Sequence, residues 1–169
     1  MVHFQESLIT WYLKNKRDLP WRHTKDPYRI WLSEVILQQT RVNQGTKYYL
    51  KFIEAFPTVE DLSKASEKKV LALWQGLGYY SRARNLHAAA KDIVQNKNNV
   101  FPSNYASLIR LKGVGPYTAA AIASFSFNEA KAVLDGNVFR VLSRIYDIPT
   151  PINTPKGLKE FEEASTALL

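Results

Sequence analysis

One glutamate lies inside a strongly apolar stretch of the sequence, where an ionised side chain is costly. The stretch is residues 31–40, WLSEVILQQT, and a helix there places Glu34 and Gln38 one turn apart on the same face. If that face borders a cleft, loss of water favours the protonated carboxyl, which can donate a proton to a leaving group. A solvated glutamate on a helix surface explains the same stretch equally well.

A second carboxylate, Asp135, comes directly before residues 136–140, GNVFR, and suits the N-cap of a helix. The capping N–H groups and the helix dipole favour its ionised form. An ionised Asp opposite a protonated Glu is the arrangement that cleaves a glycosidic bond through an oxocarbenium-like transition state. Capping alone is the simpler explanation of Asp135, and the two roles are compatible.

Between the two carboxylates, residues 111–118, LKGVGPYT, predict a hairpin between two helices. Gly113 and Gly115 can adopt backbone angles that a Cβ would resist, and Pro116 suits the first turn of the second helix. The N–H groups at that helix start carry partial positive charge and favour a phosphate oxygen, a contact that positions DNA without reading its sequence. Taken alone, two spaced glycines are more often an ordinary helix corner.

Composition narrows the class of protein. The 169 residues suffice for one substantial core, or for one domain and part of another. The hydrophobic fraction of 46% argues against disorder, and the formal net charge of +8 favours a polyanionic partner, although basic surfaces also serve solubility. The charges are dispersed, so a folded surface rather than a basic tail is expected to carry them.

Disulfides and thiolate metal sites are excluded, because the sequence has no cysteine. The three histidines, His3, His23 and His87, lack metal-ligand spacing, so we expect surface or packing roles and no metal. The start has no signal-peptide pattern, and no apolar run is long enough to cross a bilayer. We expect a soluble, cytoplasmic protein.

The hydrophobic periodicity predicts an all-α protein without repeats or strands. Asp26 and Pro27 suit the cap and first turn of one helix. Residues expected in the core are Trp31, Leu37, Phe52, Leu73, Leu86, Ile93, Leu108 and Ile122. The expected helices are 3–16, 27–39, 44–56, 58–65, 67–75, 81–95, 104–111, 117–127, 136–146 and 154–169.

Four blocks, in this order, closely resemble the adenine-specific mismatch DNA glycosylases of the MutY type, which belong to the helix-hairpin-helix DNA glycosylase superfamily. They are residues 31–40, residues 73–86 (LWQGLGYYSRARNL), the hairpin, and residues 133–141 (VLDGNVFRV). The resemblance runs from about Trp11 to Tyr146. It implies a glycosylase that removes adenine mispaired with 8-oxoguanine or guanine from double-stranded DNA, acting as a monomer associated with the nucleoid.

The resemblance also implies the architecture. A six-helix barrel domain is expected over residues 20–134, with the helix-hairpin-helix motif at about 104–127. Residues 1–19 and 135–169 are expected to form part of a second, iron–sulfur type helical domain. The active site would then lie in the cleft between the domains, since Glu34 belongs to the first and Asp135 to the second.

Residue roles follow from the resemblance position by position. Glu34 resembles the catalytic acid, which protonates the adenine ring and then helps to activate water. Asp135 resembles the group that stabilises the sugar cation, directly or through a transient covalent bond, and Asn137 and Tyr117 support it. The adenine must be extruded because its reacting atoms are inaccessible within the base stack of the duplex.

The remaining matches concern DNA binding. Trp21 and Arg22 match residues that line the pocket for the extruded adenine. Tyr79 matches a residue that contacts the duplex, and the alternative is that it is an aromatic core residue at the start of a helix. The residues that probe the duplex around the opposing 8-oxoguanine match Gln39, Thr40, Leu77 and Tyr79, and those that hold the DNA backbone match Gly113, Val114, Gly115 and Thr118.

The sequence departs from the patterns of related families at two positions near the hairpin. The endonuclease III type has a lysine directly before the hairpin threonine, for a Schiff base with the opened sugar. This sequence has Tyr117 there, which predicts a monofunctional glycosylase, and Lys112 stands where the family often has proline.

Family members usually continue into a [4Fe–4S] cluster held by four cysteines and a C-terminal domain. With no cysteine, this chain cannot bind that cluster. The apolar end Leu168-Leu169 further suggests a fragment, with weak or no activity and poor discrimination of 8-oxoguanine from guanine. A sister glycosylase for another base and a non-catalytic DNA-binding module remain alternatives.

Overall fold

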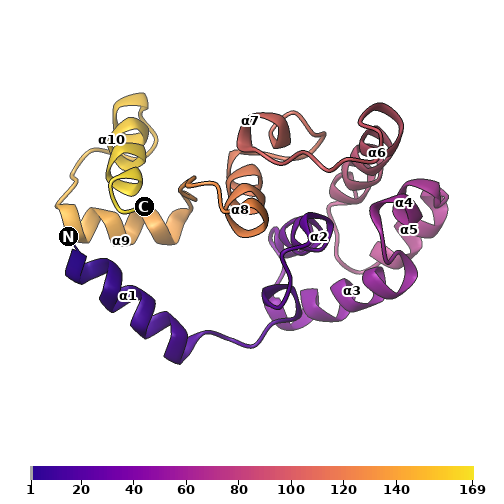
Figure 1. Cartoon of the computed structure of the whole chain (residues 1–169), viewed down its shortest axis with the longest axis horizontal. Helices are drawn as coiled ribbons and strands as arrows, with labels where there is room; N and C mark the ends of the chain where they lie inside the picture. Colours follow the sequence, from indigo (N-terminus) through magenta and orange to yellow (C-terminus); the bar gives the residue numbers. More distant parts are fainter. Residues whose placement is uncertain (1) are drawn as a thin grey trace. The chain divides into compact units, whose positions relative to one another are not determined.

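The computed structural model describes residues 2–169, with side chains from Phe4 onward, and only helices occur among them (Figure 1). The 3-10 helix Pro20–Arg22 is an addition to the expected elements. The α-helices are α1 (Val2–Asn15), α2 (Pro27–Leu37), α3 (Val42–Ala55), α4 (Val59–Lys64), α5 (Glu67–Trp74), α6 (Ser81–Asn96), α7 (Tyr105–Leu108), α8 (Pro116–Phe127), α9 (Gly136–Tyr146) and α10 (Pro155–Thr166).

Three expected helices end two or more residues earlier than the periodicity indicates, and one of them is α10, which ends at Thr166 rather than at residue 169. The helix α2 ends at Leu37 rather than at residue 39, because Gln38 and Gln39 leave the helical conformation, with Gln39 at φ 55°. The helix α7 ends at Leu108 rather than at residue 111. Beyond it, Leu111 donates its N–H to the carbonyl of Leu108, a bond of the tighter three-residue type.

Polar caps explain where most helices begin. The side chain of Asp26 accepts the N–H of Tyr28, and Pro27 follows in the first turn of α2, as expected from the sequence. By contrast, α3, α6 and α8 begin without a side-chain cap. The capping residues are Asp26, Thr58, Ser66, Asn104, Asp135 and Thr154.

The chain divides into two compact units. The central unit is Pro20–Glu129, and the terminal unit combines Met1–Leu19 with Ala130–Leu169. The expected domain of residues 20–134 thus extends slightly past the central unit at its C-terminal side. Each unit is described by itself.

The core of the central unit forms around α2, which packs against α3, α6 and α8 (Figure 1). Trp31, Leu32 and Ile36 of α2 are completely or almost completely buried. Ring edges of Phe52 and Trp74 meet with centroids 5.7 Å apart, an arrangement that suits aromatic quadrupoles. Because α2 is enclosed on several sides, its side chains are held in fixed positions.

Most of the expected core residues are buried, but two are not. Leu37 and Leu73 are only partly buried. Leu37 ends α2, and its side chain lies against Gly45 of α3, where a Cβ would come within 2.7 Å of it. Leu73 precedes Trp74, which occupies the buried position instead.

In the terminal unit, α9 packs against α10. The rings of Phe139 and Phe161 meet edge to face with centroids 5.0 Å apart. The first helix joins them near the end of the chain, where Nε2 of Gln5 donates to the carbonyl of Leu168 at 2.6 Å. In the part of the chain that the structure describes, no helix is long and apolar enough to cross a membrane.

Candidate functional site

Glu34 lies in the middle of α2 and is largely surrounded by protein. Burial raises its pKa from 4.5 to about 7, and burial is the sole cause of the shift. Neither an opposite charge nor a hydrogen bond counteracts the loss of water. A carboxyl with this pKa holds its proton for part of the time at neutral pH, as a general acid requires. The alternative of a solvated surface glutamate does not fit this burial.

The helix of Glu34 is joined to the predicted hairpin. Gln38, one turn after Glu34, donates its Nε2 to Oγ1 of Thr118 at 3.3 Å. Thr118 belongs to the first turn of α8 and is buried, so its side chain faces α2 rather than solvent. The acid and the hairpin therefore belong to one packed assembly within the central unit.

The hairpin residues Gly113 and Gly115 have different reasons to be glycine. Gly113 has φ +79°, and a Cβ there would come within 2.6 Å of Cβ of Asn85. Gly115 has φ −90°, an angle open to any residue, and no atom lies within 4 Å of a Cβ placed on it. The expectation of a special backbone angle is confirmed for Gly113 and is wrong for Gly115.

The start of α8 has backbone N–H groups that no side chain caps. Val114 is buried and anchors the hairpin, whereas Gly113, Gly115 and Tyr117 are exposed. Gly115 is the N-cap of α8 and offers no side chain to the first N–H groups. These donors, at the positive end of the helix dipole, are suited to an anion.

Two turns of the central unit expose residues that were expected to probe a duplex. The Gln39 turn, residues 38–40, contains Gln39 at φ 55° beside the half-buried Thr40. The Tyr79 turn, residues 75–79, contains Tyr79 at φ 46° with 66% of its surface exposed. This exposure excludes the alternative of an aromatic core residue.

Leu77 differs from these residues because its side chain belongs to the buried core. The structure therefore does not bring Leu77 to the surface with Gln39 and Tyr79. Trp21 is partly buried and meets Tyr49 edge to face with centroids 5.2 Å apart, while Arg22 beside it is exposed.

One residue of this region was not singled out from the sequence. Arg82, in the first turn of α6, inserts its guanidinium between the Gln39 turn and the Tyr79 turn. A cation is unfavourable near a helix N-terminus, and that position is the sequence signal that could have revealed it. Its Nη1 donates to the carbonyls of Val35 (3.1 Å), Ile36 (3.2 Å) and Gln38, and its Nη2 to those of Leu77 (3.2 Å) and Gly78 (3.4 Å).

In the terminal unit, Asp135 caps α9 as expected. Its Oδ1 accepts the N–H groups of Asn137 at 2.9 Å and Val138 at 2.8 Å. Nδ2 of Asn137 also donates to Oδ2 of Asp135 at 3.4 Å, and Arg140 donates to Oδ1 of Asn137 at 3.2 Å. These bonds fix the orientation of the carboxylate, and Asn137 takes part in them through its backbone and its side chain.

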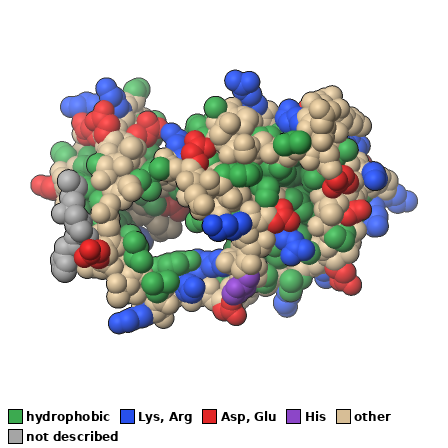
Figure 2. Space-filling model, in the orientation of Figure 1, with side chains coloured by type: hydrophobic (Ala, Val, Ile, Leu, Met, Phe, Trp, Pro, Cys, Tyr) green, Lys and Arg blue, Asp and Glu red, His purple; other side chains and the backbone are tan. Residues whose placement is uncertain are grey.

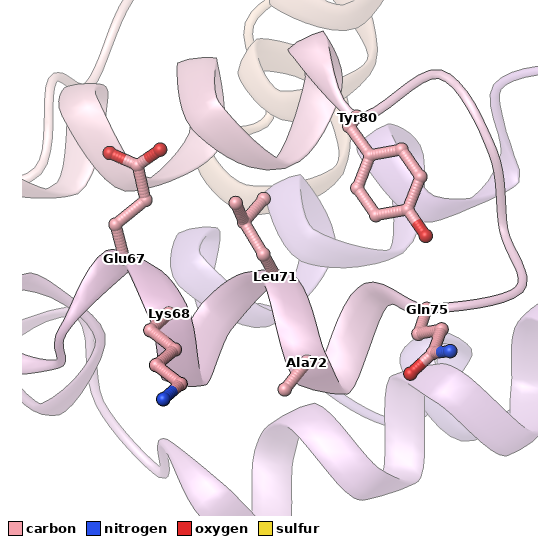
Figure 3. A pocket seen from close by; sticks show the side chains of 6 residues that line it. All are labelled: Glu67, Lys68, Leu71, Ala72, Gln75 and Tyr80. Atoms are coloured by element: carbon pink, nitrogen blue, oxygen red, sulfur yellow. The ribbon is translucent and has the colours of Figure 1, made fainter.

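A surface pocket of about 530 Å³ lies between α5 and the start of α6 (Figure 3). Leu71 and Ala72 form its floor, and Glu67, Lys68 and Tyr80 border it. It contains none of the residues expected to do chemistry. Within the described residues, no group of three His, Asp or Glu side chains could hold a metal ion; His3 lies outside the described side chains.

The net positive charge lies mostly in the central unit, because acidic residues are proportionately fewer there. Residues 20–129 hold 15 of the 23 Lys and Arg residues but 8 of the 15 Asp and Glu residues. On the face in Figure 2, Lys and Arg side chains are spread over the surface rather than gathered in one patch. Such a distribution suits contact with an extended polyanion.

Known proteins with sequences similar to this chain include adenine DNA glycosylases. The adenine DNA glycosylase of Buchnera aphidicola subsp. Baizongia pistaciae is 47% identical over 146 residues, covering 86% of this chain and 42% of that protein. The adenine DNA glycosylase of Homo sapiens is 45% identical over 151 residues, covering 84% and 28%. The chain thus spans less than half the length of these curated relatives.

Solved structures show the same fold. A thermostable thymine-DNA glycosylase matches with a TM-score of 0.86 and 29% identity, covering 98% of this chain and 76% of that one. An endonuclease III in a trapped DNA covalent intermediate matches with a TM-score of 0.80 and 19% identity, covering 98% and 75%. The expected all-α helix-hairpin-helix glycosylase fold is confirmed.

The family model described as the HhH-GPD superfamily base excision DNA repair protein matches residues 32–164. This match includes Glu34, both turns, the hairpin and Asp135. The chain belongs to the HhH-GPD superfamily of base excision DNA repair proteins.

Proposed function

We propose that this chain carries the glycosylase chemistry that removes adenine mispaired with 8-oxoguanine or guanine from double-stranded DNA, acting as a monomer. The observation that carries the proposal is the largely buried Glu34 with its pKa of about 7, on a helix bonded to the start of α8, whose first turn has no side-chain cap. Curated relatives with 45–47% identity are adenine DNA glycosylases, which supports the choice of base.

In this proposal, Glu34 donates its proton to a ring nitrogen of adenine. The base then leaves with the electron pair of the glycosidic bond, and the sugar becomes an oxocarbenium-like cation. The carboxylate of Asp135 stabilises that cation, and Asn137 holds the carboxylate in place. Ionised Glu34 next accepts a proton from water as the water oxygen bonds to the sugar, which restores the acid.

The other proposed roles concern DNA. The N–H groups at the start of α8 bind a phosphate, and the exposed Gly115 leaves room for the DNA backbone. Trp21 and Arg22 line the pocket for the extruded base. The two turns enter the duplex with Gln39 and Tyr79, Thr40 supports the first turn from its half-buried position, and Leu77 holds the second from within the core.

Tyr117, at the position of the lysine in the endonuclease III type, makes the proposed enzyme monofunctional. A tyrosine cannot form a Schiff base with the opened sugar. Borohydride added during the reaction should therefore trap no efficient protein–DNA adduct, and efficient trapping would disprove this assignment.

The proposal is tested with the 169-residue chain in excess over labelled duplexes, under single-turnover conditions that detect weak activity. We expect excision of adenine opposite 8-oxoguanine or guanine, lost in Glu34→Gln and kept in the matched control Glu54→Gln on the exposed face of α3. Equal excision by Glu34→Gln and wild type would contradict the proposal, and the absence of excision by either protein would favour a non-catalytic DNA-binding module.

A second candidate substrate comes from the structural comparison, because the thymine-DNA glycosylase is 29% identical to this chain. Adding duplexes with thymine opposite guanine to the labelled duplexes distinguishes the two candidate substrates, adenine and thymine. Preferential release of thymine would assign the chain to that activity instead. A [4Fe–4S] cluster is proposed only for longer family members, because this chain has no cysteine ligands.

A further inference from the structure

Arg82 connects two turns that are far apart in the sequence. Its guanidinium is held by carbonyl groups from the end of α2 on one side and from the Tyr79 turn on the other. It also lies over the ring of Trp74 at 5.1 Å and over the ring of Tyr79 at 5.8 Å. No other described side chain hydrogen-bonds to both turns.

Both turns contain a backbone conformation that their residues seldom adopt. Six described residues other than glycine have positive φ, and four of them are Asn or Asp, which tolerate it. The two exceptions are Gln39 and Tyr79, one in each turn. Such strain persists only where surrounding contacts enforce it, and it concentrates at functional sites.

The Tyr79 turn has further attachments to α3, as the Gln39 turn has one to α8 through Gln38 and Thr118. The hydroxyl of Tyr48 donates to the carbonyl of Gln75 at 2.6 Å, and Nε2 of Gln44 donates to the carbonyl of Gly76 at 3.2 Å. Both donors belong to α3. Each turn is thus attached to its own helix, and Arg82 links the two turns directly.

Arginine is suited to this task and lysine is not. A guanidinium has five N–H donors in a rigid plane, so it can serve two sets of carbonyls at once, whereas an ammonium group is a single point of charge. The three carbonyls at the end of α2 lie at the negative pole of that helix, which stabilises the partly buried cation.

We propose that Arg82 is a positioning residue that holds the Gln39 turn and the Tyr79 turn in one fixed arrangement, so that both enter a DNA duplex together. The DNA part of this inference rests on the proposed function. The coupling of the turns is a property of the free protein and is tested separately.

Hydrogen exchange of the free chain tests the coupling. The N–H of Thr40 bonds to the carbonyl of Leu37, and that of Leu77 to the carbonyl of Trp74, so each turn has a reporter amide. In Arg82→Lys, exchange at both should accelerate about tenfold or more, because charged hydrogen bonds are lost. The hairpin amide of Val114, bonded to Leu111, should exchange as in wild type.

The matched control is Arg84→Lys. Arg84 is an exposed arginine of the same helix that pairs with Glu67 at 3.2 Å, and its replacement should leave both turns unchanged. Acceleration at one turn alone, or at neither, would overturn the proposal.

A second variant tests the coupling without altering Arg82. Gly78 has φ +70° and open space around it, so Gly78→Ala strains the Tyr79 turn without a steric clash. If Arg82 couples the turns, exchange should also accelerate at Thr40 in the other turn. Acceleration confined to residues 75–79 would contradict the coupling, even if Arg82→Lys failed to fold.

DNA binding distinguishes positioning from general stability. Arg82→Lys should lower the preference for a duplex with adenine opposite 8-oxoguanine over a matched duplex by about tenfold, with little change for the matched duplex. An equal loss of binding affinity for both duplexes would overturn the inference that Arg82 positions the turns for DNA. If wild type itself has no such preference, the proposed function fails, while the exchange data still decide whether Arg82 couples the turns.

Discussion

Gln38 and Thr118, eighty positions apart, meet where Nε2 of the first donates to Oγ1 of the second at 3.3 Å. Gln38 follows the last residue of the helix that carries Glu34, and Thr118 lies in the first turn of α8. This bond ties the proposed acid to the proposed phosphate-binding hairpin. A hairpin displaced by DNA would therefore act on the helix of Glu34 through a direct contact.

The first prediction concerns this bond. Thr118→Val keeps the shape of the side chain but removes its acceptor, so Nε2 of Gln38 loses its partner. We expect a loss of about 1 kcal/mol in the free energy of unfolding, measured with urea. In a double-mutant cycle with Gln38→Ala the two effects should be less than additive, and full additivity would show that the bond contributes nothing.

The second prediction separates the two hairpin glycines. Gly113→Ala should destabilise the chain by roughly 1–3 kcal/mol, because φ is +79° and the new Cβ would meet Asn85. Gly115→Ala should leave the free energy of unfolding nearly unchanged and weaken DNA binding. Unfolding curves and binding isotherms on the same duplex provide the two measurements. Undiminished binding by Gly115→Ala would refute close approach of the DNA backbone.

The third prediction concerns pH. Because the pKa of Glu34 is raised to about 7, the folded chain keeps a proton that the unfolded chain releases above about 4.5. The free energy of unfolding should therefore fall as pH rises from about 4.5 to 7. Glu34→Gln should remove this loss and be more stable than wild type at pH 8 by up to roughly 3 kcal/mol.

The two proteins should differ least at pH 4, where the wild-type carboxyl is protonated in both states. Urea unfolding at both pH values measures the difference, with Glu54→Gln as the matched control. A difference of equal size at pH 4 and pH 8 would contradict burial of the ionisable group. In excision assays, the wild-type rate should decline above about pH 7 as the acid loses its proton.

The fourth prediction separates the two roles of Asp135. Asn is as good an N-cap as Asp, so Asp135→Asn should keep the stability of α9, whereas Asp135→Ala should lose about 1 kcal/mol. Both variants remove the carboxylate and should abolish adenine excision under single-turnover conditions. Full activity of Asp135→Asn would show that Asp135 is only a cap.

Local sequence signals were enough to predict many elements of this fold. Asp26 and Asp135 begin helices as their chemistry requires, and the apolar spacing identifies Trp31 and Ile122 as core residues. The prediction that Leu37 and Leu73 are core residues was wrong, because periodicity gives the face of a helix but not how far each neighbouring helix extends over it.

Long-range contacts were beyond sequence reasoning. The partners of Arg82 are backbone carbonyls, which every residue has, so no pattern of side chains identifies them. For Gly115, the sequence suggested a special backbone angle, whereas the structure shows an ordinary angle and open space. The burial of Leu77 likewise depends on the hydrophobic core of the central unit, which its local sequence does not reveal.

The terminal unit is assembled from both sides of the central unit in the sequence, which sets an order for synthesis. The first helix leaves the ribosome early, yet α9 and α10 are made only after the whole central unit. Until the carbonyl of Leu168 exists, Gln5 lacks its partner, although every residue of the central unit has already been made. We expect this interval to be when the nascent chain depends most on chaperones.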